Sequence, residues 1–321
     1  MFHFVVRILV VMTTLIYCVT ADVKSKQVVT FELTDLLFER RLDDLAATLA
    51  STGLLAIHSD NFSSNSDALE TLCRCKQELW EQSESVNNSH GSVQRHMLHD
   101  GATIRTTLAT ATMGTIPLPL SENSHSICKE RQDELEALRD QVAIASHAFV
   151  KSWDRLLHRS TTTKTTSSTT SSTKSGVPDP STLLLRNLQG GAYSSIASII
   201  NASIHLEHFH IYTKEHKLPT DNSTTISTAL LDWHMDAGLF LAFAPAQSCH
   251  AKGKDLSFFI DNDNDNDNDD PVVFPPNTVA IMLGAGAEHW LQTDLPFKAT
   301  RHAVKQMNAG NDRVWYGMST S

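Results

Sequence analysis

The sequence lacks the basic surface that nucleic-acid binding requires. It holds 26 basic and 36 acidic residues, which give a formal net charge of −10, and no segment gathers lysines and arginines into a stripe. Proteins that bind nucleic acid usually present a basic face that neutralises phosphate groups. We therefore expect no nucleic-acid partner. A hydrophobic content of 41% in 321 residues instead indicates a globular protein with a sizeable core.

Apolar runs long enough to cross a membrane are also lacking. The run at residues 8–19 follows Arg7, the one basic residue before it, and leads into the small residues of Val19-Thr20-Ala21. A bilayer core requires roughly 20 apolar residues, so this run is short for an anchor. A basic start, a short apolar run and small residues are typical of a signal peptide. We predict that residues 1–21 are a cleaved signal, that the protein enters the secretory pathway, and that it has no stable membrane span.

Cysteine is scarce, with five residues in the chain. Cys73-Arg-Cys75 is not the Cys-x-x-Cys of thiol oxidoreductases. Removal of the signal would leave an even number of cysteines, which suits two disulfides in an oxidising compartment, although three pairings are possible. The four are Cys73, Cys75, Cys128 and Cys249. A glycoprotein is also expected, because Asn-x-Ser/Thr triplets begin at Asn61, Asn87, Asn201 and Asn222.

The N-terminal region, residues 22–159, is predicted to be rich in helix. Leucines at helical spacing indicate a helix at residues 36–49, between short strands at 28–33 and 53–58. Apolar residues three and four apart indicate a second, longer helix at about 127–157. The Ser/Asn/Thr-rich residues between these parts show no clear pattern and remain unassigned.

Residues 160–176 are almost entirely serine and threonine, which favours a flexible linker, because such a segment has nothing to bury. Short apolar runs broken by turn residues follow and predict a mainly β domain at 177–321. The expected strands are 204–212, 239–243, 256–260, 279–283 and 299–304. The Asp-Asn repeat at 261–269 lacks the glycine turn and closing glutamate of a calcium-binding EF-hand, so we expect a solvated loop there.

A His-x-Asp pair carries the chemistry. On an extended strand, residues two apart point to the same side, so His234 and Asp236 can hold one ion together. His302, in a downstream run that also reads as strand, offers a third ligand. Two imidazoles and one carboxylate on one side of iron(II) leave the opposite positions open, which is the facial triad of non-haem oxygenases.

The order of these motifs resembles the 2-oxoglutarate/iron(II)-dependent dioxygenase superfamily, in particular its isopenicillin N synthase-like branch. The resemblance lies in Asp232 to Phe243, Leu283-Gly284, Leu295 to Val304, and an arginine 11 residues after the second histidine, Arg313. It covers residues 195–318 well and residues 28–60 only as a pattern. It implies a double-stranded β-helix (jelly roll) behind a helical N-terminal region and the activity of an oxidoreductase; with the predicted signal peptide, we expect this oxidoreductase to be secreted or lumenal.

The resemblance also implies the roles of single residues and the partners of the site. His234, Asp236 and His302 would ligate iron(II), and Arg313 would pair with the distal carboxylate of 2-oxoglutarate. Tyr212 stands where the family has a tyrosine that contacts this co-substrate. The expected reaction consumes O2 and 2-oxoglutarate, releases succinate and carbon dioxide, and oxidises a small organic substrate.

One departure from the family concerns its Arg-x-Ser motif. Here the motif is Arg313-Val314-Trp315, so an indole replaces the serine hydroxyl; Tyr316 could supply a hydroxyl if the strand were bulged. This keeps two alternatives open: an oxidase that takes its electrons from the substrate without 2-oxoglutarate, and a decayed secreted jelly roll that only binds. The other histidines, including His205, His208, His210 and His289, are interpreted as core or surface residues rather than ligands.

Overall fold

The computed structural model describes residues 25–63, 65–84, 93–98, 100–111, 118, 120, 126–165, 185–186, 192–203, 205–214, 229–250, 257–261, 271–291, 293–305 and 312–320. The expected signal peptide, residues 166–176 of the expected linker and residues 262–269 of the Asp-Asn repeat lie outside these ranges. Within the ranges no helix is both long and apolar enough to span a membrane.

The described residues form helices and strands both before and after position 166. Those before position 166 are mixed. They are β1 Lys26–Gln27, β2 Thr30–Glu32, α1 Leu33–Leu37, α2 Leu42–Ser51, β3 Leu54–His58, the 3-10 turn Asp60–Phe62, α3 Asn65–Arg74, α4 Lys76–Glu84, β4 Val93–Met97, β5 Thr103–Ala111, α5 Ile127–Glu130 and α6 Gln132–Thr165. The second part holds β6 Leu185–Arg186, β7 Ala192–Tyr193, α7 Ile196–Ala202, β8 His205–Lys214, β9 Ala229–His234, β10 Phe240–Ser248, β11 Phe258–Ile260, β12 Val272–Val273, β13 Thr278–Leu283, α8 Ala285–His289, β14 His302–Lys305 and β15 Asp312–Thr320.

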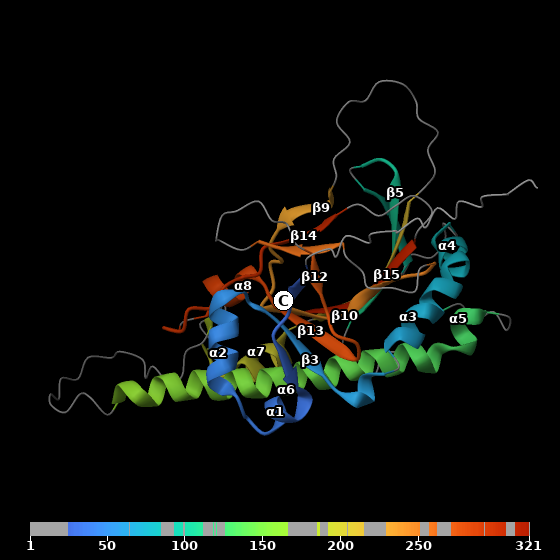
Figure 1. Ribbon diagram of the computed structural model, residues 1–321. Helices are drawn as coiled ribbons and strands as arrows, with labels where there is room; N and C mark the ends of the chain where they lie inside the picture. Colours follow the sequence, from blue (N-terminus) through green and yellow to red (C-terminus); the bar gives the residue numbers. More distant parts are fainter. Residues whose placement is uncertain are drawn as a thin grey trace, which may run out of the picture.

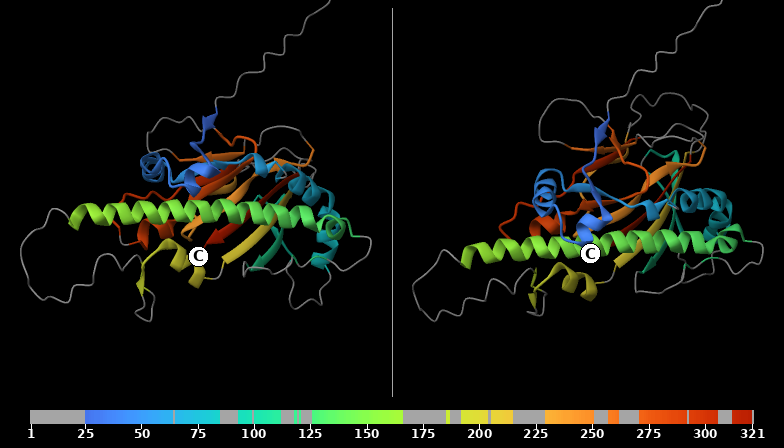
Figure 2. Two further views of the ribbon diagram at one scale, coloured as in Figure 1. Left: turned by 90° about the horizontal axis from the view of Figure 1, so that it is seen from below. Right: turned by 60° about the horizontal axis from the view of Figure 1, so that its bottom comes forward.

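Two sheets and one long helix form the layers of the molecule (Figure 1). The large sheet has eight strands in the order β2-β3-β13-β10-β15-β8-β5-β4, and the small sheet has the order β11-β14-β9. Helix α6 crosses one face of the large sheet, as both views in Figure 2 show. The small sheet lies over the opposite face. This mixed sheet with helices agrees with the expected mainly β fold.

Two hydrophobic cores follow from this layering. The first lies between the large sheet and the helices, and α6 contributes Leu138, Val142, Phe149 and Trp153 to it. Their spacing of four and seven residues places them on one side of the helix. The second core is smaller and includes Phe243 of the large sheet and Phe258 and Val304 of the small sheet. It fixes the distance between the two sheets.

The large sheet joins the two halves of the chain. Strands β2, β3, β4 and β5 come from the residues before 160–176, and β8, β10, β13 and β15 come from the residues after them. The longest pairing across this division joins β5 to β8, from Thr103 opposite Lys214 to Ala111 opposite Leu206. Residues from both halves therefore share one continuous sheet surface.

Two details of the expected elements are wrong. The helix expected at 36–49 is two helices, because Glu39 and Arg41 adopt positive φ angles of 55° and 56° between α1 and α2. Helix α6 runs to Thr165, so the first six residues of the expected linker are helical. Adding residues to a formed helix avoids the cost of nucleation, which lets weak helix formers extend it. All five strands expected after residue 177 are present, with ends that differ by up to five residues, whereas β9, which ends at His234, was not expected.

One disulfide connects the helical segments to the large sheet, and a second connects two helical segments to each other. Cys73 pairs with Cys249, at the end of β10, and Cys75 pairs with Cys128 in α5. The Cys-x-Cys spacing thus ties one point of the chain to two distant segments. This confirms the expectation of two disulfides and selects one of the three pairings.

Candidate metal centre and cavity

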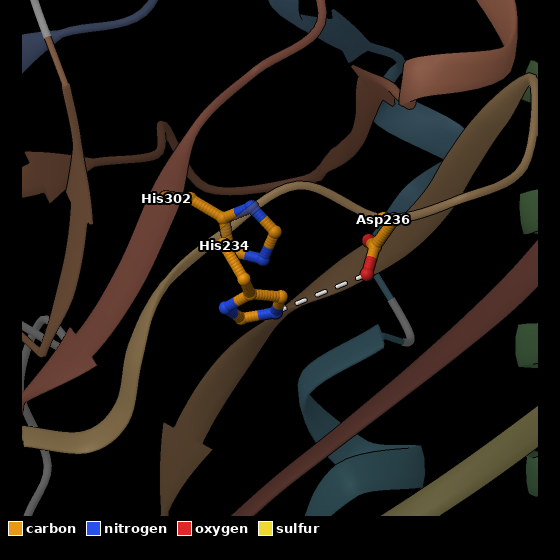
Figure 3. Close-up of side chains that lie close together, drawn as sticks. All are labelled: His234, Asp236 and His302. Carbon is orange, nitrogen blue, oxygen red and sulfur yellow. Dashed lines mark ion pairs between the residues drawn. The ribbon is translucent and has the colours of Figure 1, made fainter.

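Three side chains that could hold a metal ion come together at one end of the two sheets. His234 ends β9, Asp236 follows it by two residues, and His302 begins β14. One ligand atom from each lies within 4.8 Å of the others. Figure 3 shows the two imidazoles and the carboxylate facing a common space. The structure therefore brings together all three residues that the sequence pattern singled out.

Pairing of the two short strands sets the histidines side by side. His234 and His302 are directly opposite residues of β9 and β14, and their ring centres are 4.2 Å apart. His234 Nδ1 lies 2.6 Å from the carbonyl oxygen of Asp232, and His302 Nδ1 lies 3.2 Å from that of Thr300. A carbonyl can only accept, so each ring carries its proton on Nδ1 and keeps the lone pair of Nε2 for a metal.

Asp236 reaches the site from a loop rather than from a strand. The expectation that both residues of the His-x-Asp pair lie on one extended strand is wrong, because β9 ends at His234. The loop is held instead by the first turn of α8, where the Ala285 N–H donates to the Asp236 carbonyl at 2.7 Å. Gly284 makes this approach possible, since a Cβ atom there would lie 2.8 Å from the same carbonyl oxygen. The Asp236 Oδ1 atom is thereby brought to 3.9 Å from His234 Nε2.

The electrostatics of the site favour neutral imidazole. Burial lowers the pKa of His302, and His234 lowers it further, while the Asp236 charge acts in the opposite direction. A metal binds the unprotonated ring, so a lowered pKa keeps the ligand available at neutral pH. Two neutral imidazoles with one ionised carboxylate are a donor set that suits iron(II), and they fit that ion here.

A cavity of about 640 Å³ opens beside these three residues, between the large and small sheets. Part of its wall is apolar, formed by Leu231, Leu241, Phe243, Phe258, Met282 and Val304. Another part is polar, formed by Gln94, Arg105, Thr107, His208, His210 and Arg313. Its volume lies within the range of roughly 300–1,000 Å³ that is usual for ligand pockets.

The two remaining residues singled out by the sequence also line this cavity. Arg313 of β15 is opposite Tyr212 of β8 in the large sheet, and the Arg313 guanidinium carbon lies 5.9 Å from the centre of the Tyr212 ring. Both residues are buried, at 7% and 1% exposure. All five predicted site residues therefore belong to one place in the fold.

Trp315 occupies the position of the expected serine and lines the same cavity. It lies opposite His210 across β15 and β8, with the ring centres 4.7 Å apart. Tyr316 cannot replace the missing hydroxyl, because it points to the other face of the sheet and donates to Glu207 Oε2 at 3.0 Å. The possibility of a bulge at Tyr316 is wrong, since pairing with β8 is regular from Asp312 to Thr320.

The sequence interpretation missed the importance of two histidines. His208 and His210 line the cavity, while His205 faces the opposite side of β8, with its Nε2 bonded to the Ile200 carbonyl. The alternation of His208, His210 and Tyr212 was the signal that could have placed them on the site face. Burial lowers the pKa of both cavity histidines, and the Arg105 charge contributes to each shift. Both rings are therefore neutral at pH 7.

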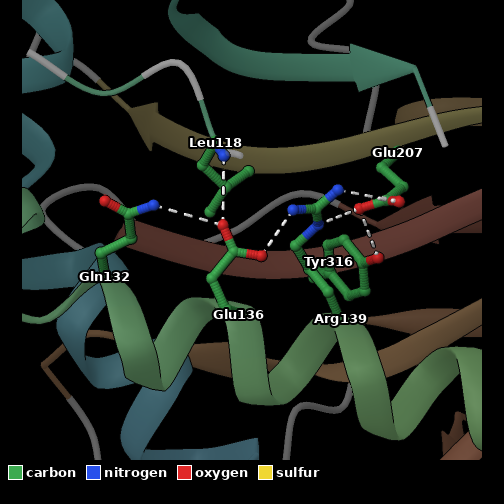
Figure 4. Close-up of polar contacts among 6 residues, drawn as sticks. All are labelled: Leu118, Gln132, Glu136, Arg139, Glu207 and Tyr316. Atoms are coloured by element: carbon green, nitrogen blue, oxygen red, sulfur yellow. Dashed lines mark hydrogen bonds and ion pairs between the residues drawn. The ribbon is translucent and has the colours of Figure 1, made fainter. Parts of the chain in front are cut away.

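The opposite face of the large sheet carries a second polar cluster (Figure 4). Arg139 of α6 pairs with Glu207 of β8 and with Glu136, and Tyr316 donates to the same Glu207 carboxylate. Burial alone would lower the pKa of Arg139, but its hydrogen bonds and ion pairs with Glu207 and Glu136 raise it overall. Burial together with the Glu207 charge raises the pKa of Tyr316. This cluster joins α6 to the sheet.

Comparison with known proteins was informative at the level of structure only. No protein-family model matches the sequence, and the search of curated proteins found no significant match. A full-length Neurospora crassa protein, solved in complex with alpha-KG, is similar with a TM-score of 0.53 at 10% identity, over 91% of this chain and 83% of that one.

Two further solved structures give the same result. A putative 2OG-Fe(II) oxygenase family protein from Caulobacter crescentus has a TM-score of 0.52 at 10% identity, over 91% of this chain and 86% of that one. JOX2, solved in complex with 2OG, Fe and JA, has a TM-score of 0.52 at 10% identity, over 92% of this chain and 75% of that one. The chain therefore has the fold of the 2-oxoglutarate/iron(II) oxygenases.

Proposed function

We propose that this chain is a 2-oxoglutarate- and iron(II)-dependent dioxygenase that hydroxylates or oxidises a small organic substrate. One observation carries the proposal: His234, Asp236 and His302 converge at the edge of the cavity that Arg313 also lines. The fold supports it, because JOX2 was solved with 2OG and Fe and the Neurospora crassa protein with alpha-KG, which is 2-oxoglutarate. In this proposal the two facing sheets form the double-stranded β-helix, and the helical segments before residue 166 cover it.

Each site residue has a defined task in this proposal. His234 and His302 present Nε2, and Asp236 presents a carboxylate oxygen, so that three positions on one side of the ion are filled. Iron(II), when bound there, supplies the oxygen activation that no side chain can perform. The carbonyls of Asp232 and Thr300 hold the rings in orientation, which raises ligand basicity and fixes the site.

Arg313 and Tyr212 are assigned to the co-substrate. A guanidinium matches a carboxylate through two parallel hydrogen bonds, so buried Arg313 suits the distal carboxylate of 2-oxoglutarate. Tyr212, beside it on β8, adds a hydroxyl donor. The apolar wall of the cavity, including Phe243 and Phe258, keeps water from the reacting groups.

A second candidate, an oxidase that does not consume 2-oxoglutarate, is favoured by Trp315. Its indole stacks beside His210 in the cavity that Arg313 also lines, where the family has a small hydroxyl residue. The two candidates share the iron site and differ in the co-substrate. Binding of 2-oxoglutarate therefore separates them.

We also propose that the protein works in the secretory pathway. Its two disulfides suit an oxidising compartment. Asn61 and Asn201, two of the four glycosylation triplets, are exposed, as an acceptor asparagine must be. Asn87 and Asn222 lie outside the described residues. In this proposal residues 1–21 are removed as a signal peptide.

Iron content and 2-oxoglutarate titration of the purified chain test the proposed activity. We expect the parent to bind both, and His302→Ala to lose most of its iron affinity because one of three ligands is gone. Arg313→Leu should keep iron but bind 2-oxoglutarate about 10- to 100-fold more weakly, since a lost charged hydrogen bond costs roughly 1.5–3 kcal/mol.

The control is Arg155→Leu, which removes an exposed arginine of α6 from its pair with Glu39 and should change neither property. Unchanged 2-oxoglutarate affinity in Arg313→Leu would contradict the co-substrate assignment and favour the oxidase. Full iron uptake by His302→Ala would contradict the metal site itself.

A further inference from the structure

Arg105 is a second arginine in the cavity, and the site described above gives it no task. It lies on β5 directly opposite Tyr212, whose other neighbour across the sheet is Arg313. Its side chain lines the cavity, and its Nε atom is buried without a hydrogen-bond partner. Among the described residues no carboxylate forms an ion pair with it. A partly buried cation in this state carries a desolvation cost that a bound anion would offset.

The charge balance of the cavity points to an anion other than 2-oxoglutarate. Asp236 is the one carboxylate among the described residues that line the cavity. Iron(II) with Arg313 would supply three positive charges, and Asp236 with 2-oxoglutarate three negative ones. His208 and His210 add no positive charge, because burial and the nearby Arg105 lower the pKa of both imidazoles. Arg105 is then left as one uncompensated positive charge.

The position of Arg105 also separates it from Arg313. The two arginines stand on strands β5 and β15, with β8 between them. Neighbouring strands lie about 4.8 Å apart, so the two backbones are roughly 10 Å apart. A guanidinium fork binds one carboxylate in two parallel hydrogen bonds, so two arginines at this separation suit two anionic groups.

The groups around Arg105 are suited to a carboxylate. Thr107, the next residue on the same face of β5, places its hydroxyl 2.9 Å from His210 Nδ1, and Gln94 lies opposite Thr107 on β4. Gln94 can donate hydrogen bonds from its amide group into the cavity, and the Thr107 hydroxyl, which also lines the cavity, is shared with His210. The apolar wall faces them from the small sheet and continues on the same face of the large sheet, at β10 and β13. This arrangement fits a molecule with one anionic end and an apolar body.

We propose that the oxidised substrate is an organic acid whose carboxylate pairs with Arg105 on β5. This rests on the proposed dioxygenase function, since it takes Arg313 for the co-substrate. Arg105 is thus a specificity-determining residue. Its charge selects acids over neutral molecules of the same shape and orients the apolar body toward His234, Asp236 and His302.

Matched acids and amides test this inference. The full chain, loaded with iron(II) and 2-oxoglutarate under nitrogen, is titrated calorimetrically with benzoate, phenylacetate and hexanoate and with the corresponding primary amides. We expect at least one acid to bind about tenfold more tightly than its amide, the effect of one charge-assisted contact. Arg105→Leu should abolish this preference, Arg105→Lys should keep part of it, and both should retain the parent affinity for 2-oxoglutarate.

Arg95→Leu is the matched control, because Arg95 lies on the adjacent strand β4 and stacks on Trp80, away from the cavity. It should keep the preference for acids. The inference is wrong if no acid is preferred over its amide, if the preference survives in Arg105→Leu, or if Arg105→Leu loses 2-oxoglutarate instead. A parent chain that takes up neither iron nor 2-oxoglutarate would contradict the proposed function. A parent chain that binds both but does not prefer any acid over its amide would contradict only the role of Arg105.

Discussion

Arg139 and Arg105 lie on opposite faces of the same sheet and differ in their partners. Arg139, on the α6 side, is paired with Glu207 and Glu136, and Tyr316 completes the hydrogen bonding of Glu207. Arg105, on the cavity side, has a buried Nε atom without a partner. A charge whose partners are supplied by the fold holds the structure together. A charge without such partners is kept at a cost to stability, which indicates a role in binding.

The same contrast separates the histidines of β8. His205 faces the helices and bonds the carbonyl of Ile200, at the end of the preceding helix α7. His210 faces the cavity, where burial and the charges of His208, Arg105 and Arg313 hold its pKa well below the usual value. One strand thus carries structural groups on one side and groups of the site on the other. The alternation of side chains along a strand makes this division possible.

The largest expected effect is on the free energy of unfolding, when the arginine on each face of the large sheet is replaced by leucine. Arg139→Leu leaves Glu207 buried without its cation and should lower the free energy of unfolding by about 3 kcal/mol, at the lower end of the cost of breaking a buried pair. Arg105→Leu removes no partner and relieves the desolvation cost of an unpaired cation, so it should leave the free energy of unfolding unchanged or raise it. Urea unfolding of the metal-free proteins measures both values. Equal losses in the two variants would contradict the distinction between the faces.

A smaller effect should appear in the pH dependence of stability. In the unfolded chain His210 takes up a proton below pH of about 6.5, but in the folded chain its pKa is well below that value. The unfolded state therefore binds more protons as the pH falls, and folding loses stability below pH 6.5. Between pH 6.5 and 5.5 the parent should lose about 1 kcal/mol of its free energy of unfolding through His210, the amount expected from one histidine that takes up a proton only in the unfolded chain. His210→Gln should not show this part of the loss. An identical pH dependence in parent and variant would show that His210 is not held neutral.

The sequence was informative where chemistry depends on local spacing. His234 and Asp236 are two residues apart, and His302 and Arg313 follow in the order and spacing of the family that the sequence resembles, so residue type and order singled out side chains that the fold brings to one cavity. The sequence could not show that Asp236 leaves the strand, because that follows from its contact with Ala285, 49 residues later. Nor could it give the strand order of the large sheet, which depends on pairings between distant segments.

Arg105 was not predictable for a physical reason. Strand β5, Thr103–Ala111, carries Arg105 and Thr107 on its cavity face and buried threonines such as Thr106 on the other, so apolar and polar residues do not alternate. Hydrophobic periodicity detects strands with one apolar face. A strand that lines a polar site loses this signal, and the residues that line the site are then the hardest to find.

His234, Asp236 and His302 beside the cavity are proposed to support oxidation driven by 2-oxoglutarate. Succinate release from 2-oxoglutarate, measured for the iron-loaded chain and for Asp236→Ala in the presence of the acids above, tests this proposal most directly. We predict that the parent releases succinate only with both iron and O2, and that Asp236→Ala releases none above background, because two imidazoles alone hold iron too weakly. A parent that binds iron but releases no succinate, or an Asp236→Ala variant as active as the parent, would contradict this account.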